Sequence, residues 1–292
     1  MLVSVIITTH NRESLLRRAI ESVLNQSYPK IECIVVDDAS DVVSNVKDQY
    51  SIIYEYIQKS DSKGGNHARN VGLSKASGEY VAFLDDDDYW MPDKIEKQLN
   101  LFLSKSCVLV YCGLNLEIVD KDSVKHKVVY PLINYQGDIS KRILYSICTS
   151  TSCIFTKRQL IIDEGGFDEN LHFWQEYDLL IRLAQKGEFY YVNEPLVNYR
   201  IDAYDKHRLT NKYWEWRKAV NYIHEKYCYL YDQLNLLEKL QVNTLVWRDS
   251  VGRCKKSGLI WRSRWMRLLS ILGYLPYGIL NLGEVKSRIK KL

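Results

Sequence analysis

The sequence lacks the features of an exported or membrane-spanning chain. Its first residues, MLVSVII, contain neither the basic segment nor the small-residue cleavage site of a signal peptide. No stretch reaches the ~18 apolar residues that span a bilayer. The seven cysteines are an odd number without a CxxC pair or a His-rich knuckle, which argues against a disulfide framework and a structural zinc site. We therefore expect reduced thiols in a cytoplasmic chain that is not exported and does not cross a membrane.

Two glycine-rich phosphate-binding signatures are also absent. The sequence contains neither GxGxxG nor GxxxxGK[ST], so it indicates neither a dinucleotide-binding fold nor a P-loop. It has no internal repeat and no low-complexity tract. With 292 residues, 46% of them hydrophobic and 26% charged, long-range disorder is excluded. The length suits one large α/β domain, alone or with an appendage.

Charge is distributed unevenly along the chain. The net charge is only +4, but residues 206–292 contain 18 Lys and Arg against 6 Asp and Glu, a balance of +12, which leaves −8 for residues 1–205. Five of the seven tryptophans also lie in the basic segment. This asymmetry predicts two units with different roles.

The order of strand and helix patterns predicts an α/β fold with a mostly parallel central sheet and helices on both faces. Apolar β-branched runs alternate with amphipathic helical patterns through the first hundred residues, and the pattern is helical beyond about residue 205. The expected strands are 3–9, 31–36, 52–57, 79–84, 107–113, 128–130, 152–156, 189–192 and 196–199, and the expected helices before residue 205 are 15–24, 67–76, 93–103, 139–147 and 174–185.

Four consecutive aspartates, Asp85 to Asp88, follow a predicted buried strand. Ligands of open α/β sheets bind at the carboxyl ends of the strands. Strand alternation would place Asp85 and Asp87 on one side and Asp86 and Asp88 on the other. Because adjacent carboxylates repel each other, Mg²⁺ or Mn²⁺ shared with a phosphate is expected here; a solvated acidic turn is the alternative.

A second acidic pair, Asp37 and Asp38, ends another predicted buried strand and should open on the same edge. A carboxylate at this place can accept hydrogen bonds from a nucleobase or a ribose. The alternative is that the pair caps a helix.

Five motifs in this order resemble glycosyltransferase family 2, the inverting enzymes of GT-A fold, and the likeness covers residues 1 to about 202. The motifs are VSVIITTHNR at 3–12, VVDDAS at 35–40, ARNVGL at 68–73, FLDDDD at 83–88, and GGFDE at 165–169 followed by QEYDL at 175–179.

The resemblance assigns roles in donor binding. Thr8, Asn11 and Arg12 would line the nucleotide pocket, Asp38 would hydrogen-bond uracil or another base, and Arg69 would approach the base or the diphosphate.

For the aspartate run, the resemblance implies that Asp85 contacts the ribose or a metal-bound water. Asp87 would ligate the cation, Mn²⁺ or Mg²⁺. Asp86, grouped with the donor-binding residues, and Asp88 would lie at the rim or behind the ligating residues.

The helix beginning near Trp174 should supply the general base, because an inverting transfer requires a carboxylate that takes the proton of the acceptor hydroxyl. The family usually shows Glu-Asp-x-Asp here with the second acid as base, which corresponds to Glu176. Gln175 replaces the first acid. Asp178 is the other catalytic candidate, roughly 200° further around the helix, and the alternative for this segment is a solvated helix N-terminus.

The family often has a histidine after its final Tyr-Arg that contacts the metal or the diphosphate. Here Arg200 is followed by no adjacent histidine, and His207 is the nearest candidate metal ligand; a surface histidine is the alternative. Arg200 would meet a phosphate.

The resemblance implies a metal-dependent inverting glycosyltransferase that uses a nucleotide sugar, with a UDP-sugar as the expected donor, in bacterial surface polysaccharide synthesis. Residues 1–205 would form the GT-A domain, with a nucleotide-sugar half at 1–105 and an acceptor half at 106–205, followed by a basic, Trp-rich helical extension at 206–292. The acceptor would be a glycan or a lipid-linked precursor. A non-catalytic scaffold or binding subunit of this fold is the alternative, and a nucleotidyltransferase is a third reading.

The basic extension interleaves cations and aromatics, in WRSRWMRLL at 261–269, before an uncharged stretch too short and too interrupted by Pro and Gly to span a bilayer. This pattern is typical of contact with an anionic membrane surface and places the protein at the inner face of the cell membrane. The alternative is a tail packed on the catalytic domain or in a homo-oligomer. No RNA- or DNA-binding module matches, so nucleic acid is not an expected partner.

Overall fold

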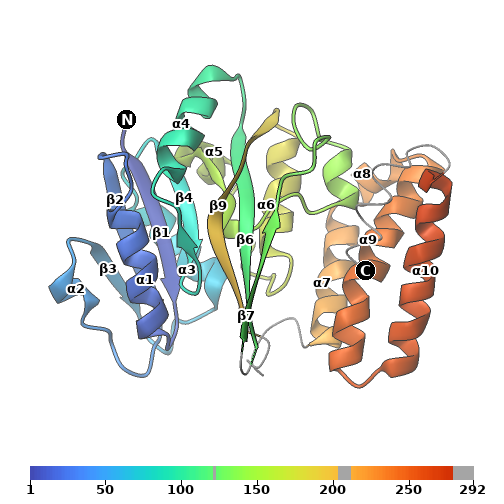
Figure 1. The fold of residues 1–292 in the computed structure, drawn as a ribbon, viewed down its shortest axis with the longest axis horizontal. Helices are drawn as coiled ribbons and strands as arrows, with labels where there is room; N and C mark the ends of the chain where they lie inside the picture. Colours follow the sequence, from blue (N-terminus) through green and yellow to red (C-terminus); the bar gives the residue numbers. More distant parts are fainter. Residues whose placement is uncertain (121–122, 203–211, 279–292) are drawn as a thin grey trace. The chain divides into compact units, whose positions relative to one another are not determined.

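The computed structural model describes residues 1–120, 123–202 and 212–278, and contacts divide the chain into two compact units. The first comprises Met1–Ser140 and Cys148–Tyr204, and the second comprises Lys141–Ile147 and Asp205–Leu292. Figure 1 shows the helices and strands of both units. No helix in the described ranges combines the length and the apolar character that crossing a bilayer requires.

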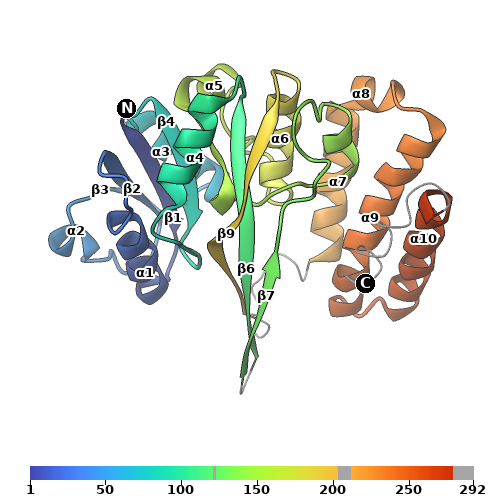
Figure 2. The same cartoon turned by 45° about the horizontal axis from the view of Figure 1, so that its top comes forward.

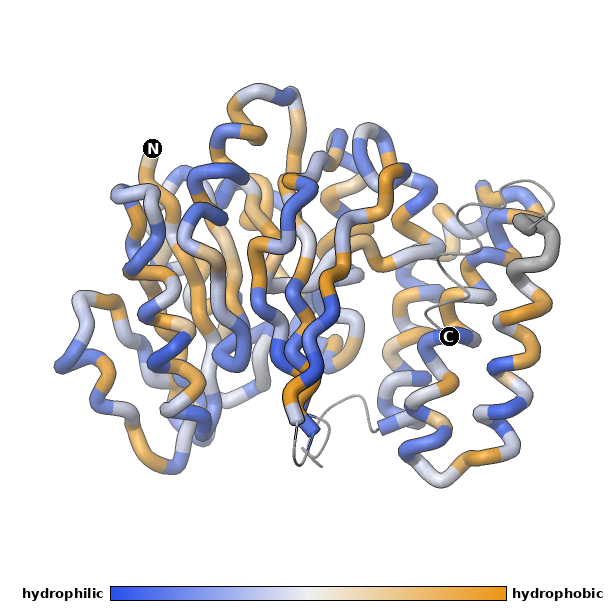
Figure 3. Tube along the Cα trace, viewed as in Figure 1, coloured by the Kyte–Doolittle hydropathy of each residue, from blue (hydrophilic) through white to orange (hydrophobic). Residues whose placement is uncertain are grey.

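Four parallel strands form the first half of the sheet. β1 (Val3–Thr9) lies between β2 (Ile31–Asp38) and β4 (Tyr80–Asp85), and β3 (Ile53–Ile57) pairs with β2. The apolar side chains of β1, β2 and β4, except Ile31, are buried, as expected for strands covered on both faces. Figure 3 shows the hydropathy of these residues along the chain. The carboxyl ends of β1, β2 and β4 therefore meet at one edge.

The second half of the sheet is mixed. β8 (Phe155–Lys157) runs antiparallel to β4 and to β6 (Leu109–Asp120), and β6 pairs in parallel with β9 (Phe189–Asp202). β5 (Tyr89–Trp90) pairs antiparallel with β9, and β7 (Ser123–Val129) pairs antiparallel with β6. The β6–β7 hairpin, with β9 paired along β6, extends beyond β1, β2 and β4 in both views (Figure 2).

Helices cover both faces of this sheet. α1 (Glu13–Leu24) and α3 (Gly65–Lys75) both contact β1 and β2, and they lie on opposite faces (Figure 1). α1 buries Leu16, Ala19, Ile20 and Val23, which form one helical stripe. The other helices of this unit are α2 (Val46–Gln49), α4 (Lys94–Ser104), α5 (Arg158–Asp163) and α6 (Gln175–Ala184).

Gly72 lets α3 lie close to the sheet. A Cβ at this position would be 2.5 Å from Cγ2 of Ile6 in β1 and 3.2 Å from Cγ2 of Val36 in β2. Carbon atoms do not approach to 2.5 Å without displacement, so only glycine fits between the helix and these two strands. Arg69, one turn earlier, is positioned by the same contact.

The second unit is helical. It contains α7 (Tyr213–Lys226), α8 (Cys228–Asp232), α9 (Leu236–Lys256), α10 (Ile260–Gly278) and the 3₁₀ turn η1 (Arg142–Tyr145), which contacts α9. α9 begins with a capping box, in which Asn235 and Glu238 each accept the other's backbone N–H. α10 packs along α9.

The α/β fold and the helical extension expected from the sequence are confirmed. Two short elements, α2 and β5, were not expected from the sequence, and the other main differences lie between residues 114 and 200. The expected helix 139–147 is only the 3₁₀ turn η1, the strand expected at 152–156 is η2 (Thr151–Cys153) followed by β8, and the two strands expected after residue 188 are the single strand β9. A change of pairing register at Gly113 lets β9 continue through Pro195, where the sequence pattern appears interrupted.

Candidate active site

The edge where β1, β2 and β4 end carries polar loops with unusual backbone conformations. Among the described residues other than glycine, positive φ angles occur at Asn11, Ala39 and Trp174, with values of 56°, 62° and 55°. These residues follow β1, follow β2 and precede α6. Such conformations are costly for non-glycine residues and concentrate at functional sites, so this edge is a candidate functional site.

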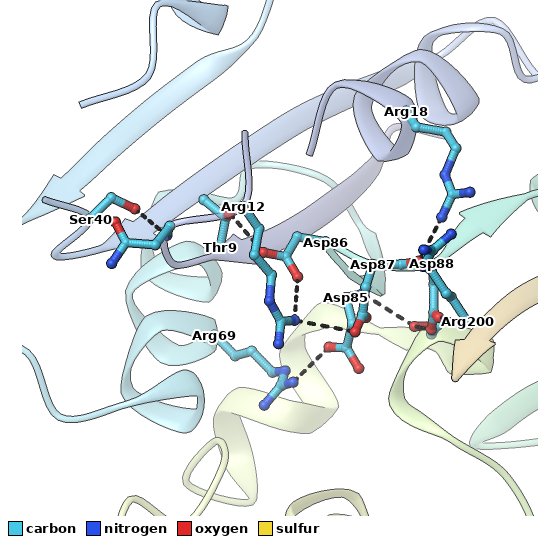
Figure 4. Close-up of polar contacts among 12 residues, drawn as sticks. Thr9, Arg12, Arg18, Ser40, Arg69, Asp85, Asp86, Asp87, Asp88 and Arg200 are labelled. Carbon is cyan, nitrogen blue, oxygen red and sulfur yellow. Dashed lines mark hydrogen bonds and ion pairs between the residues drawn. The ribbon is translucent and has the colours of Figure 1, made fainter. Parts of the chain in front are cut away.

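The aspartate run is a turn and not a continuation of the strand. β4 ends at Asp85, and the N–H of Asp88 donates to the C=O of Asp85 over 3.0 Å. The expectation that the four aspartates continue the strand and alternate between its two sides was therefore wrong. The turn nevertheless leaves the side chains of Asp85 and Asp87 partly exposed and buries Asp86 and Asp88. Figure 4 shows the four carboxylates with residues that contact them. Asp86 and Asp88 therefore lie behind the outer carboxylates and not at the rim.

Arg12 connects two of these carboxylates. Its Nη1 donates to Oδ1 of Asp86 over 3.1 Å and to Oδ2 of Asp87 over 3.2 Å, while Oδ2 of Asp86 accepts from the hydroxyl of Thr9 over 2.8 Å. Burial raises the pKa of Asp86 to about 6, although the Arg12 charge acts in the opposite direction. The end of β1 and the turn after β4 are thereby joined.

Asp88 is fully buried and holds the turn from behind. It accepts from the hydroxyl of Ser152 over 2.6 Å and from the backbone N–H of Arg200 over 3.0 Å. Burial, followed by the charges of Asp87 and Asp85, raises the pKa of Asp88 well above its ordinary value. Arg200, expected to meet a phosphate, thus reaches this site at least through its main chain.

Arg69 joins the aspartate turn to the start of α6. Its guanidinium is almost enclosed, and Nη2 contacts Oδ1 of Asp85 at 2.7 Å. Nη1 donates to Oε1 of Gln175 over 2.8 Å and to Oδ1 of Asn66 over 3.2 Å. Gln175, the departure from the expected acid, therefore supplies a neutral acceptor to an arginine that already holds a carboxylate.

The two acids after β2 have different surroundings. Asp37 accepts from the N–H of Ser40 over 2.9 Å and from the hydroxyl of Tyr54 over 2.6 Å, so it holds the turn. Asp38 is buried, and its Oδ1 has no hydrogen-bond partner among the described residues. Such an acceptor is costly unless something else donates to it. Asp38 is therefore the member of the pair suited to a nucleobase.

The loop after β1 lies beside this pair. The N–H of Asn11 donates to Oγ of Ser40 over 2.8 Å, and its side chain exchanges hydrogen bonds with Asp41. His10 Nδ1 donates to the C=O of Asp38 over 2.7 Å. Thr8 pairs in register with Val36 and with Asp85. The residues expected to line a nucleotide pocket are thus gathered from β1, β2 and β4.

The two acids of α6 differ in accessibility. Asp178 is fully buried and forms an ion pair with Arg182, whose Nη2 lies 2.7 Å from Oδ2. Arg182 also donates to the carbonyls of Glu164 and Gly166, so this pair ties the helix to the turn before it. Glu176 is half-buried, in the first turn of the helix.

Several residues of this site were not predicted from the sequence. Thr9 and Ser152 bond the buried aspartates, and Arg18 donates from Nη2 to the C=O of Asp87 over 2.8 Å while stacking on Tyr89 at 4.3 Å. Thr9 directly precedes the His-Asn-Arg segment and carried a signal; Ser152 and Arg18 did not. His207 lies outside the described residues.

The outer carboxylates suit a divalent cation in chemistry, though not as a closed protein site. Asp85 and Asp87 offer partly exposed oxygen ligands of the kind that Mg²⁺ and Mn²⁺ prefer. The described part of the chain contains no group of three or more His, Cys, Asp or Glu placed to hold a metal. The fit is therefore to a cation that takes its other ligands from water and a substrate phosphate, which is usual for Mg²⁺.

Comparison with known proteins agrees with this geometry. The model of the family described as "Glycosyl transferase family 2" matches residues 4–161, which contain β1 from its second residue, β2 to β4 and the aspartate turn. The chain belongs to glycosyltransferase family 2.

Similarity to individual glycosyltransferases covers more of the chain than the family model does. The chain is 30% identical over 254 residues to the "Putative teichuronic acid biosynthesis glycosyltransferase TuaG" of Bacillus subtilis, covering 82% of this chain and 97% of TuaG. It is 34% identical over 197 residues to "UDP-Glc:alpha-D-GlcNAc-diphosphoundecaprenol beta-1,3-glucosyltransferase WfaP" of Escherichia coli, covering 64% of this chain and 71% of WfaP. An uncharacterized glycosyltransferase of Rickettsia prowazekii is 33% identical over 208 residues, 69% of this chain but only 64% of that relative's length.

A similar fold is found in S. aureus TarS. The crystal structure of its residues 1–349 matches 94% of this chain and 89% of that one with a TM-score of 0.58 at 18% identity, and the complex with UDP gives 0.56. At this identity the match establishes the fold.

Proposed function

We propose that the protein is an inverting glycosyltransferase that moves a sugar from a nucleotide sugar, of the UDP-sugar class, to a hydroxyl of a glycan or lipid-linked acceptor in bacterial surface polysaccharide synthesis. The observation that carries this proposal is the meeting of an unpartnered Asp38 oxygen, the Asp85–Asp88 turn and the start of α6 in one unit. Names of family relatives, which include a glucosyltransferase acting from UDP-Glc on a diphosphoundecaprenol acceptor, support the donor and acceptor classes.

Asp38 is proposed to bind the nucleobase, because its Oδ1 is buried and accepts no hydrogen bond from the described residues. A uracil N–H would satisfy it. Thr8, Asn11 and Arg12, which lie on the same edge, are proposed to border the nucleotide, with Arg69 and Arg200 on the diphosphate side.

Glu176 is proposed as the general base. Of the two acids in the first turn of α6, it is the one not fully buried, and Asp178 is engaged with Arg182. A base must reach the acceptor hydroxyl to take its proton as that oxygen attacks the anomeric carbon. We assign Asp178 a structural part.

Asp87 is proposed to hold the cation, Mn²⁺ or Mg²⁺, with Asp85 beside it. When bound, such a cation neutralises the charge that develops on the leaving diphosphate. Arg12, already in contact with Asp86 and Asp87, adds a fixed positive charge at the same place.

A donor screen tests the proposal. The full chain is incubated with a diphosphoundecaprenol-linked sugar, Mn²⁺ and a panel of UDP-sugars, and the product's linkage is determined. We expect transfer from one donor with inversion at the anomeric carbon. Donor binding without transfer or hydrolysis of any donor would favour the alternative of a binding subunit, and Glu176→Gln is the matched inactive control.

We further propose that the protein works at the inner face of the cell membrane, where a lipid-linked acceptor would be met. The basic, Trp-rich extension supports this location through its charge. Homo-oligomerisation through the same extension is the alternative.

A further inference from the structure

Helix α10 buries small side chains against α9. Ser263 and Ser270 are 8% and 0% exposed, and the hydroxyl of Ser263 donates to the C=O of Val251 over 2.9 Å. Gly273 is also buried, and a Cβ there would collide with the side chain of Thr244. The face of α10 that meets α9 is thus lined with small residues that permit a close approach.

Large apolar residues lie on the opposite face. Trp261, Trp265, Leu268 and Leu272, here called the exposed stripe, recur at intervals of four, three and four residues, which places them within roughly 60° of arc on a helix. Trp261 is 81% exposed and Trp265 is 56% exposed. A helix on the surface of a globular protein normally has the reverse arrangement, so this face indicates a contact made outside the unit.

Positive charge accompanies the exposed stripe. α10 contains Arg262, Arg264 and Arg267 and no acidic residue. Arg264 and Arg267 are exposed, and the guanidinium of Arg264 lies 5.1 Å from the ring centre of Trp261. Arg262 is turned toward α7, where it donates to the hydroxyl of Tyr213.

We propose that the exposed stripe, with Arg264 and Arg267, docks on an anionic phospholipid surface, with α10 lying in the plane of the headgroups. Tryptophan favours that depth, and arginine favours the anionic headgroups. A second copy of the chain fits less well, because pairing two α10 helices would bring arginines together with no acid on either helix. The biological purpose of this docking rests on the proposed function; the docking itself rests on the helix.

Vesicle co-sedimentation of the full chain tests the proposal. We expect binding to vesicles of phosphatidylglycerol and phosphatidylcholine, little binding to phosphatidylcholine alone, and weaker binding as salt rises. The double variant Trp261→Ser, Trp265→Ser should bind on the order of tenfold or more weakly, because two large side chains no longer leave water. Arg264→Gln should cost about fivefold at low salt.

Tyr229→Ala is the matched control, because Tyr229 is an exposed aromatic residue of α8. Tyr229 precedes the first turn of α9, whereas Trp261 follows the last turn of α9. Those ends of α9 are about 30 Å apart. The control should bind as the wild type does. Equal binding of the tryptophan variant, or no preference for anionic vesicles, would overturn the proposal, as would a wild-type oligomer in light scattering that the variant converts to monomer. Absence of sugar transfer would count against the proposed function alone, because vesicle binding is read without a donor.

Discussion

Each outer carboxylate of the aspartate turn is held by an arginine from a different element, Asp87 by Arg12 after β1 and Asp85 by Arg69 in α3. This pairing fixes the two side chains and limits their mutual repulsion. It also means that the turn is organised by this chain's own residues. A diphosphate entering here would meet positive charge already in position.

The two acids of α6 should respond differently to substitution. Glu176→Gln should lower kcat by about 10²–10⁴-fold, the usual contribution of general-base catalysis, with the melting temperature unchanged. Asp178→Asn should instead lower the free energy of unfolding by about 3–5 kcal/mol, because the charge of Arg182 loses its buried partner. Steady-state kinetics and urea unfolding on both variants separate the roles. A stable, inactive Asp178→Asn together with an active Glu176→Gln would reverse the assignment.

Removing the proposed cation ligand should abolish dependence on the metal and leave the fold intact. Titration calorimetry of UDP should show affinity that rises with Mn²⁺ and falls with EDTA in the wild type, and no such dependence in Asp87→Asn. The activation free energy of sugar transfer should rise by several kcal/mol, because the leaving group loses its stabilising charge. Arg12 keeps Asp86 as a partner, so the melting temperature should stay near the wild-type value. Normal transfer by folded Asp87→Asn would refute the ligand assignment.

Asp86 should make stability depend on pH below neutrality. Its folded-state pKa of about 6 exceeds the ordinary value of 3.8, so the folded state binds the proton more tightly than the unfolded state does. Between about pH 4 and pH 6 the free energy of unfolding should therefore decrease as pH rises, by roughly 3 kcal/mol at most, and then level off.

Asp86→Asn is the comparison variant, because the amide keeps the size and removes the titration. The difference between wild-type and variant unfolding free energies, measured in urea from pH 4 to pH 7.5, isolates this group from Asp88, whose raised pKa acts in the same direction. A difference that does not change with pH would mean that Asp86 is not the titrating group.

At the scale of elements, the close approach of α3 to the sheet predicts a sharp cost at Gly72. Gly72→Ala should lower the free energy of unfolding by about 1–3 kcal/mol, because the new methyl overlaps Ile6. Activity should fall as well if Arg69 shifts with the helix. Gly252→Ala in α9 is the control: nothing lies within 4 Å of its Cβ position, and alanine should stabilise that helix by roughly 0.5–1 kcal/mol. Equal effects of the two substitutions in urea unfolding would show that α3 has room to move.

The sequence predicts well those elements whose burial in the fold is visible in their own run of apolar and polar residues. β1 was predicted with its observed bounds because a strand covered on both faces is a continuous apolar run. The stretch 114–150 was not, because β7 is an exposed hairpin strand whose pairing with β6 decides its length. Similarly, the sequence shows four aspartates but not that Ser152, far along the chain, holds one of them.

At the scale of the whole molecule, the second unit is not continuous in sequence, since Lys141–Ile147 belongs to it. Ile143 and Leu144 of this segment are buried, and η1 contacts α9. Truncation after Tyr204 should therefore produce a chain that aggregates, because it leaves these two apolar side chains without α9.

Light scattering on the truncated chain checks this expectation. The same truncation carrying Ile143→Asn and Leu144→Asn should remain monodisperse, because the bared side chains are then polar. A monodisperse truncated chain with the native Ile143 and Leu144 would mean that η1 needs no cover from α9.

The discontinuity of the second unit also sets an order of events at the ribosome. Ile143 and Leu144 emerge well before their partner α9 has been made, about 100 residues later, which at 5–20 residues per second is roughly 5–20 s. During that interval β8, α6 and β9 are synthesised and can complete the sheet, while η1 remains without α9. The speed of translation through residues 148–256 thus determines how long the apolar side chains of η1 are accessible to chaperones in the nascent chain.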